Sequence, residues 1–128
     1  MVCNAQTANN AALAQLAGHL LQQGLVFLCA WGPDCERVSH VFEHAAIQHD
    51  FKQGREYPTI ISMNLRRDKL DTVTDYFRDA CCPDTAFERT CRAGLVLTVD
   101  TPPLTAYIRQ RLASQASDPR FLYATCLR

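Results

Sequence analysis

The chain lacks an excess of charge of either sign. Thirteen Lys and Arg residues balance thirteen Asp and Glu residues over 128 residues, so the formal net charge is zero. Proteins that bind nucleic acids or anionic membranes usually carry a basic surplus. The balance therefore argues against nucleic acid and membrane as partners. It also removes the self-repulsion that keeps small proteins apart, which favours self-association into a homodimer.

The chain also lacks an unbroken apolar run long enough to cross a membrane. The longest candidate, Ala11 to Trp31, is interrupted by polar side chains such as Gln15 and His19. The first ten residues are uncharged and mostly polar, unlike the start of a secretory signal. We therefore expect a cytoplasmic protein, in which the seven cysteines remain reduced as free thiols or small buried residues.

Three motifs of well-known enzyme classes are missing. The sequence contains no Gly-x-Gly-x-x-Gly, no Walker loop and no Gly-x-Ser-x-Gly. The adjacent Cys81 and Cys82 lack the two-residue gap of a zinc knuckle, and Arg89 lies one residue too far from Cys82 for a cysteine phosphatase loop. These absences favour a protein that is not an enzyme and uses no cofactor.

What the chain does contain is a regular alternation of strand and helix patterns. Short apolar runs such as Leu25 to Trp31 are typical of strands covered on both faces of a parallel sheet. Each is followed by a segment whose apolar residues recur every three or four positions, as on a helix with one buried face. The expected strands cover 25–31, 59–65, 95–99 and 121–127, and the expected helices cover 9–23, 34–48, 68–82, 86–92 and 101–114.

This alternation predicts one α/β domain over residues 1–128. Strands joined by helices of ten or more residues form right-handed crossovers. We therefore expect a three-layer αβα sandwich with a mainly parallel sheet of three or four strands. The polar segment 49–57 is expected to be a loop.

Ligands of such folds usually bind beyond the carboxyl ends of the strands. The residues that follow the predicted strands there are the candidate ligand-binding residues: Trp31, Gly32, Pro33, Asp34, Cys35, Asn64, Arg66, Arg67, Asp100 and Thr101. Among these, Asn64, Arg66 and Arg67 suit a small anionic ligand at the start of the following helix. Turn-forming residues are also what any strand-to-helix connection needs, so a purely structural role is the alternative.

Cys35 is the candidate catalytic residue. A thiol in the first turn of a helix faces the positive end of the helix dipole, which favours the reactive thiolate. The run Phe27 to Val38 superficially resembles the active-site region of thioredoxins, and Tyr57-Pro58-Thr59 resembles their cis-proline tripeptide, although the paired cysteines of that family are absent. The alternative is a small core residue beside Val38.

His40 and His44 lie one helical turn apart, a spacing that binds a metal only if further ligands converge. No Glu follows His40, so the zinc-protease signature is absent, and a solvated helix face explains the pair equally well. We therefore expect no metal site.

The run Trp31-Gly32-Pro33-Asp34-Cys35-Glu36-Arg37-Val38 resembles a W-G-x-D-C-E-R-V motif of a family of small uncharacterised bacterial domains. The resemblance implies a small bacterial α/β domain, and because the family has no established activity it implies nothing about a substrate. In it Gly32 would form the turn, Asp34 would cap the helix, and Arg37 would reach Asp34 or Glu36 to brace the loop.

Together these observations favour an accessory or interaction protein that binds another protein or itself. A thiol-dependent redox protein using Cys35 is the first alternative. A binder of small anionic ligands is the second.

Overall fold

A computed structural model describes residues 1–3, 5–55, 60–79, 85–87, 89–91, 93–99, 102–113 and 121–126. Strands and helices alternate along the chain, as the sequence predicted. The elements are β1 (Val2–Cys3), α1 (Asn10–Gln22), β2 (Phe27–Trp31), α2 (Cys35–Lys52), β3 (Ile61–Leu65), α3 (Leu70–Asp79), a short 3-10 helix (Thr85–Phe87), β4 (Gly94–Val99), α4 (Pro102–Ala113) and β5 (Phe121–Cys126).

The five strands form one sheet in the order β3-β2-β1-β4-β5, and every neighbouring pair is parallel. The prediction of an α/β fold is therefore confirmed, and the predicted last strand is present as β5 at one edge. The expectation of three or four strands is wrong, because β1 was missed. This strand has two residues, too few to show an alternating pattern.

β1 nevertheless occupies the centre of the sheet. Val2 is in register with Ala30 of β2 and with Leu97 of β4. The amino group of Met1 donates a hydrogen bond of 2.5 Å to the carbonyl of Leu95, and the amide of Leu97 donates one of 2.8 Å to the carbonyl of Met1. Backbone pairing on both sides compensates for the shortness of the strand.

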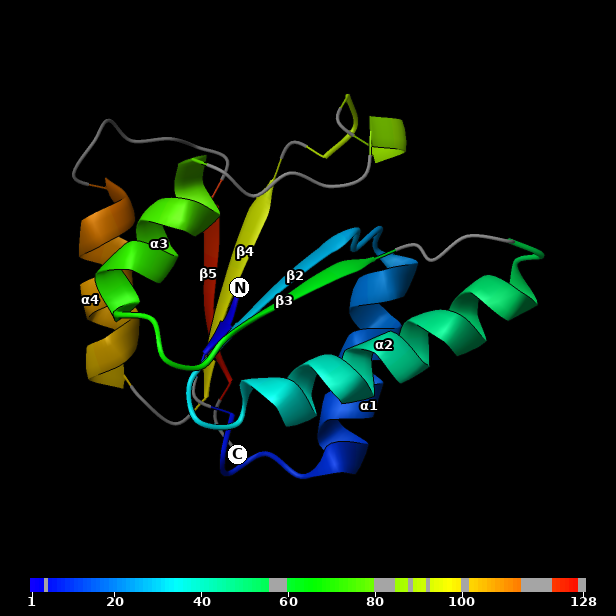
Figure 1. Ribbon diagram of the computed structural model, residues 1–128, viewed down its shortest axis with the longest axis horizontal. Coiled ribbons are helices and arrows are strands. Elements are labelled where there is room, and N and C mark those ends of the chain that lie inside the picture. Colours follow the sequence, from blue (N-terminus) through cyan, green and yellow to red (C-terminus); the bar gives the residue numbers. More distant parts are fainter. Residues whose placement is uncertain are drawn as a thin grey trace.

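The helices cover the sheet from both sides, with α1 and α2 against one face and α3 and α4 against the other (Figure 1). Side chains of β2 alternate between the two cores: Leu28 and Ala30 pack toward α1 and α2, whereas Cys29 packs toward α3 and α4. Alternation along a strand explains this division. It also explains why β2 is a continuous apolar run, since both of its faces are buried.

Two helix boundaries differ from the prediction. α2 continues to Lys52, four residues beyond the expected end, because residues 49–52 are as compatible with the last turn of a helix as with a loop. The helix expected over 86–92 is a single 3-10 turn at Thr85–Phe87. The predicted turn at Gly32 is confirmed by its φ of 113°, a backbone conformation that favours glycine.

Candidate functional site

The carboxyl ends of the strands, where the sequence placed the ligand site, are held together by side-chain bonds. The indole Nε1 of Trp31 donates a hydrogen bond of 3.0 Å to the carbonyl of Asp68, joining the end of β2 to the loop after β3. Trp31 is half-buried and packs against the core beneath α3 and α4. This residue therefore closes one end of the sheet.

Arg37 fastens the start of α2 to the loop between β1 and α1. Its guanidinium contacts Asp34 Oδ2 at 2.5 and 3.0 Å, Asn10 Oδ1 at 2.6 Å and the carbonyl of Ala5 at 2.9 Å. The predicted brace between Arg37 and Asp34 is thus present. Asp34 occupies the predicted N-cap position of α2, but its side chain makes no capping bond and instead pairs with Arg37.

Cys35 occupies a core position instead of an exposed one. Its side chain is 1% exposed and belongs to the cluster that contains Val38 and Phe42. Burial, reinforced by the negative charge of Glu36, raises the pKa of the Cys35 thiol. The helix dipole does not overcome these two effects, so the thiol remains protonated where the redox interpretation needs a thiolate. The tripeptide 57–59 lies outside the described residues.

Of the candidate anion-binding residues, some contact neighbouring side chains and one is exposed to solvent. Asn64 Oδ1 accepts a hydrogen bond from the buried Ser39 hydroxyl. Arg66 lies 3.8 Å from Glu36 on the surface. Arg67 is exposed and has no hydrogen bond or ion pair to any described residue. Asp100 and Thr101 lie outside the part of the chain that the structure describes, so their relation to the other candidates stays a prediction.

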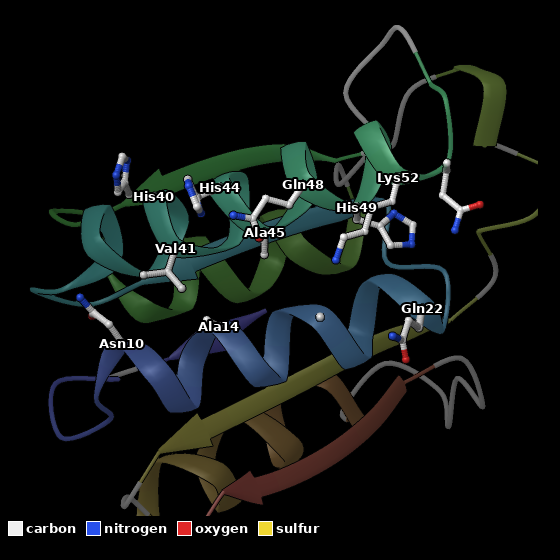
Figure 2. A pocket seen from close by; sticks show the side chains of 12 residues that line it. Asn10, Ala14, Gln22, His40, Val41, His44, Ala45, Gln48, His49 and Lys52 are labelled. Atoms are coloured by element: carbon white, nitrogen blue, oxygen red, sulfur yellow. The ribbon is translucent and has the colours of Figure 1, made fainter.

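His40 and His44 are exposed on α2, and within the described ranges no group of three or more potential ligands gathers around a metal position. Their surroundings are instead a groove of about 540 Å³ between α1 and α2 (Figure 2). Its lining residues are Asn10, Ala14, Gly18 and Gln22 of α1, and His40, Val41, His44, Ala45, Gln48, His49 and Lys52 of α2, with Gln53 at the end.

A second hollow of about 500 Å³ continues the groove toward the amino ends of the strands and shares Gln22, His49 and Gln53 with it. His49 lies where the two meet. Its Nδ1 is buried, has no hydrogen-bond partner among the described residues, and is 3.6 Å from a carboxylate oxygen of Asp50. Asp50 is itself buried and lies 3.9 Å from Arg55.

The outer face of α2 beside the groove carries two exposed apolar side chains. Ile47 is 65% exposed and Phe51 is 86% exposed. Together with His40 and His44 they are spaced four, three and four residues apart, which places all of them on one side of the helix. Sequence reasoning missed this surface because it treated Phe51 as part of a loop. The groove was missed because it requires two helices to be placed side by side.

No helix in the described portion is long and apolar enough to cross a membrane.

Comparison with protein families gives one match. The model of a family described as a domain of unknown function (DUF7684) matches residues 1–115. This range is wider than the Phe27 to Val99 over which the motif suggested a resemblance to an uncharacterised family. No curated protein and no solved structure matches the chain.

Proposed function

Because the chain belongs to the DUF7684 family, whose function is not known, we propose from the geometry that it is a non-catalytic interaction module. It would be an accessory protein of the bacterial cytoplasm, built as a three-layer αβα sandwich, that binds another protein or a second copy of itself. The binding surface would be the outer side of α1 and α2, comprising the groove and the exposed face of α2.

The observation that carries this proposal is the exposure of Phe51 and Ile47 on one face of α2. Large apolar side chains grouped with aromatic and imidazole rings are typical of protein interfaces. A helix that served only to cover the sheet would gain nothing from exposing them. Their removal from water on binding provides a driving force for association.

The state of the predicted catalytic residue Cys35 and of two predicted ligand-binding residues supports the same proposal. Cys35 is buried with a raised pKa, and Asp34 and Asn64 are occupied by Arg37 and Ser39. A nucleophile needs access and an activating base, and neither accompanies Cys35 among the described residues. Cys29, Cys35 and Cys91 are free thiols, which supports a reducing compartment.

Site-specific photo-crosslinking tests the proposal. A photoreactive p-benzoyl-phenylalanine replaces Phe51, and the matched control replaces Tyr107, which is 42% exposed on α4, across the sheet from α2. Irradiation of cells of the source organism is expected to give a discrete adduct at position 51 and none at position 107. Mass spectrometry of the adduct identifies a partner or a second copy. Absence of an adduct at position 51, or equal adducts at both positions, would contradict the proposal.

A further inference from the structure

Among the described residues, no acidic side chain lines the groove between α1 and α2. Its lining carries Lys52 and three of the four histidines of the protein, and its other polar groups are the amides of asparagine and glutamine. α1 has no Asp, Glu, Lys or Arg along its whole length. None of the acidic residues that the structure describes lines this groove, although the Asp50 carboxylate lies 3.6 Å from Nδ1 of His49 at one end of it. Lys52, the one Lys or Arg of the lining, attracts negative charge and would disfavour a basic segment.

The floor of the groove is small and apolar. Ala14 and Gly18 of α1 face Val41 and Ala45 of α2, and Figure 2 shows Val41 and Ala45 directed toward α1. The α1 residues that line the groove recur every four positions from Asn10 to Gln22, which corresponds to about 18 Å of helix. Rows of this spacing normally form side-chain ridges, and the small residues at Ala14 and Gly18 leave this row low enough for the ridge of another helix to pack against it.

No contact within the described part of the chain explains why position 18 is a glycine. A glycine in a helix interior destabilises the helix relative to alanine. A Cβ atom at this position would meet no described neighbour within 4 Å, so packing inside the protein does not demand a glycine. The residue leaves open the space that a docked element would occupy.

We propose that this groove binds an acidic amphipathic helix of a partner protein. The apolar side of the partner helix would cover Ala14, Gly18 and Ala45, and its carboxylates would face Lys52 and the neighbouring histidines. This inference rests on the proposed interaction function and specifies its partner. Binding of a helix in a hydrophobic groove is a recurrent mode of peptide recognition.

A second copy of the chain is a poorer occupant. Its α1 offers no carboxylates, and those of its acidic helix α3 are already engaged. Asp75 contacts Arg111 at 2.8 Å, Asp79 contacts Arg78 at 2.5 Å, and Asp71 accepts a hydrogen bond from Tyr107. Charge complementarity therefore points to a different chain.

The test uses a defined probe, a fluorescein-labelled 14-residue helical peptide of Leu, Ala and Glu with leucines at helical spacing. The matched control peptide has Gln at every Glu position. Fluorescence anisotropy with the full-length protein is expected to show binding of the Glu peptide at least tenfold tighter than that of the Gln peptide, and weaker binding as salt concentration rises. Equal affinity of the two peptides would overturn the proposal.

Two sets of variants locate the peptide. Gly18→Leu is expected to fill the groove and weaken binding at least tenfold without lowering the melting temperature, whereas Gly18→Ala, which adds one methyl group to the same space, is expected to weaken binding by a smaller factor. Lys52→Glu is expected to weaken binding, and Lys69→Glu, an exposed site before α3, is expected to leave it unchanged. Unaltered binding by Gly18→Leu in a folded protein would place the peptide elsewhere and refute the groove.

Two further results separate the alternatives. A single-stranded oligonucleotide that binds as tightly as the Glu peptide, and is also blocked by Gly18→Leu, would contradict the proposal in favour of nucleic acid. A photo-crosslink at position 51 together with failure of the Glu peptide would leave the interaction module intact and reject the acidic helix. Absence of the crosslink at position 51 together with failure of the Glu peptide to bind would reject both the interaction module and the acidic helix.

Discussion

The surroundings of Cys35 and of Gly18 give these residues properties that their positions in the sequence do not indicate. Cys35 stands at the start of a helix, where the dipole alone would promote ionisation, yet its burial in the core has the larger effect. Gly18 is surrounded by helix-forming residues and adopts helical geometry, yet nothing nearby requires it to be small. Neither property is visible in the residue type alone.

The raised pKa of Cys35 predicts slow modification of its thiol. Iodoacetamide reacts with thiolate, and a raised pKa lowers the thiolate fraction at any given pH. At pH 8 we expect Cys35 in the folded protein to react much more slowly than the exposed Cys91, and to react at the rate of an ordinary thiol in denaturant. Peptide mass spectrometry of timed samples measures both rates. Faster labelling of Cys35 than of Cys91 would restore the redox interpretation.

Gly18→Ala is expected to stabilise the protein by about 0.5–1 kcal/mol, because alanine favours the helical backbone and its methyl group has room. Urea unfolding monitored by circular dichroism measures the change. The control is Gly24→Ala, which also has open space around its Cβ but sits at a φ of 91°. That variant is expected to be destabilised, and a similar gain in both variants would contradict the conformational explanation.

Among the elements, α3 and α4 are joined by a network of charges on their outer side. Arg111 bonds to Asp75 at 2.8 Å and lies 3.7 Å from Asp71, and Arg78 lies 3.3 Å from Asp75. The hydrogen bond from Arg111, helped by the charges of Arg111 and Arg78, lowers the pKa of Asp75. The two helices are therefore linked by groups that lose their attraction in acid.

The sign of the resulting pH dependence follows from the lowered pKa. The unfolded state takes up a proton at Asp75 near the ordinary value of about 3.9, before the folded state does. The stabilisation is therefore present above that pH and is lost as the pH falls toward the lower folded pKa. We expect Asp75→Asn to be less stable than the wild type at pH 6 and to lose less stability between pH 4 and pH 2. Parallel unfolding curves for the two proteins over that range would contradict this account.

Helices and strands that bury an apolar pattern could be predicted well from the sequence. Elements without such a pattern could not. The run ending at Trp31 and the stripe of Val73 and Phe77 each mark a strand or helix that the structure contains. β1 escaped prediction because two residues carry no periodicity, and its place is set by pairing with strands distant in sequence. The end of α2 escaped because Phe51 faces solvent, so apolar periodicity gave no signal there.

The position of the candidate site in the fold was predicted well from the sequence. The roles of its individual side chains were predicted less well. The end of β2 and the loop after β3 do meet, through Trp31 and the carbonyl of Asp68, because parallel strands end at the same edge of the sheet. Which polar groups remain free there depends on side-chain partners such as Arg37 and Ser39, which no spacing rule identifies. Arg67 is the one charged ligand-binding candidate that the structure leaves exposed and unpaired among the described residues.

At the scale of the whole molecule, the prediction of one domain is tested by cooperative unfolding. Trp31 is the single tryptophan of the chain and lies where β2, the loop after β3 and the α3 side of the core meet. If residues 1–128 form one domain, tryptophan fluorescence and far-ultraviolet circular dichroism should give the same urea midpoint. Separated midpoints would indicate two independently folding units.

The central position of β1 determines when the sheet can be completed during protein synthesis. Met1 and Leu95, which bond in the middle of the sheet, are 94 residues apart in the chain. Contacts of such long sequence separation form slowly, because a large loop must close first. During synthesis on the ribosome, the edge of β1 that pairs with β4 therefore stays unpaired until β4 has left the exit tunnel. During that interval the nascent chain is open to pairing with the wrong strand.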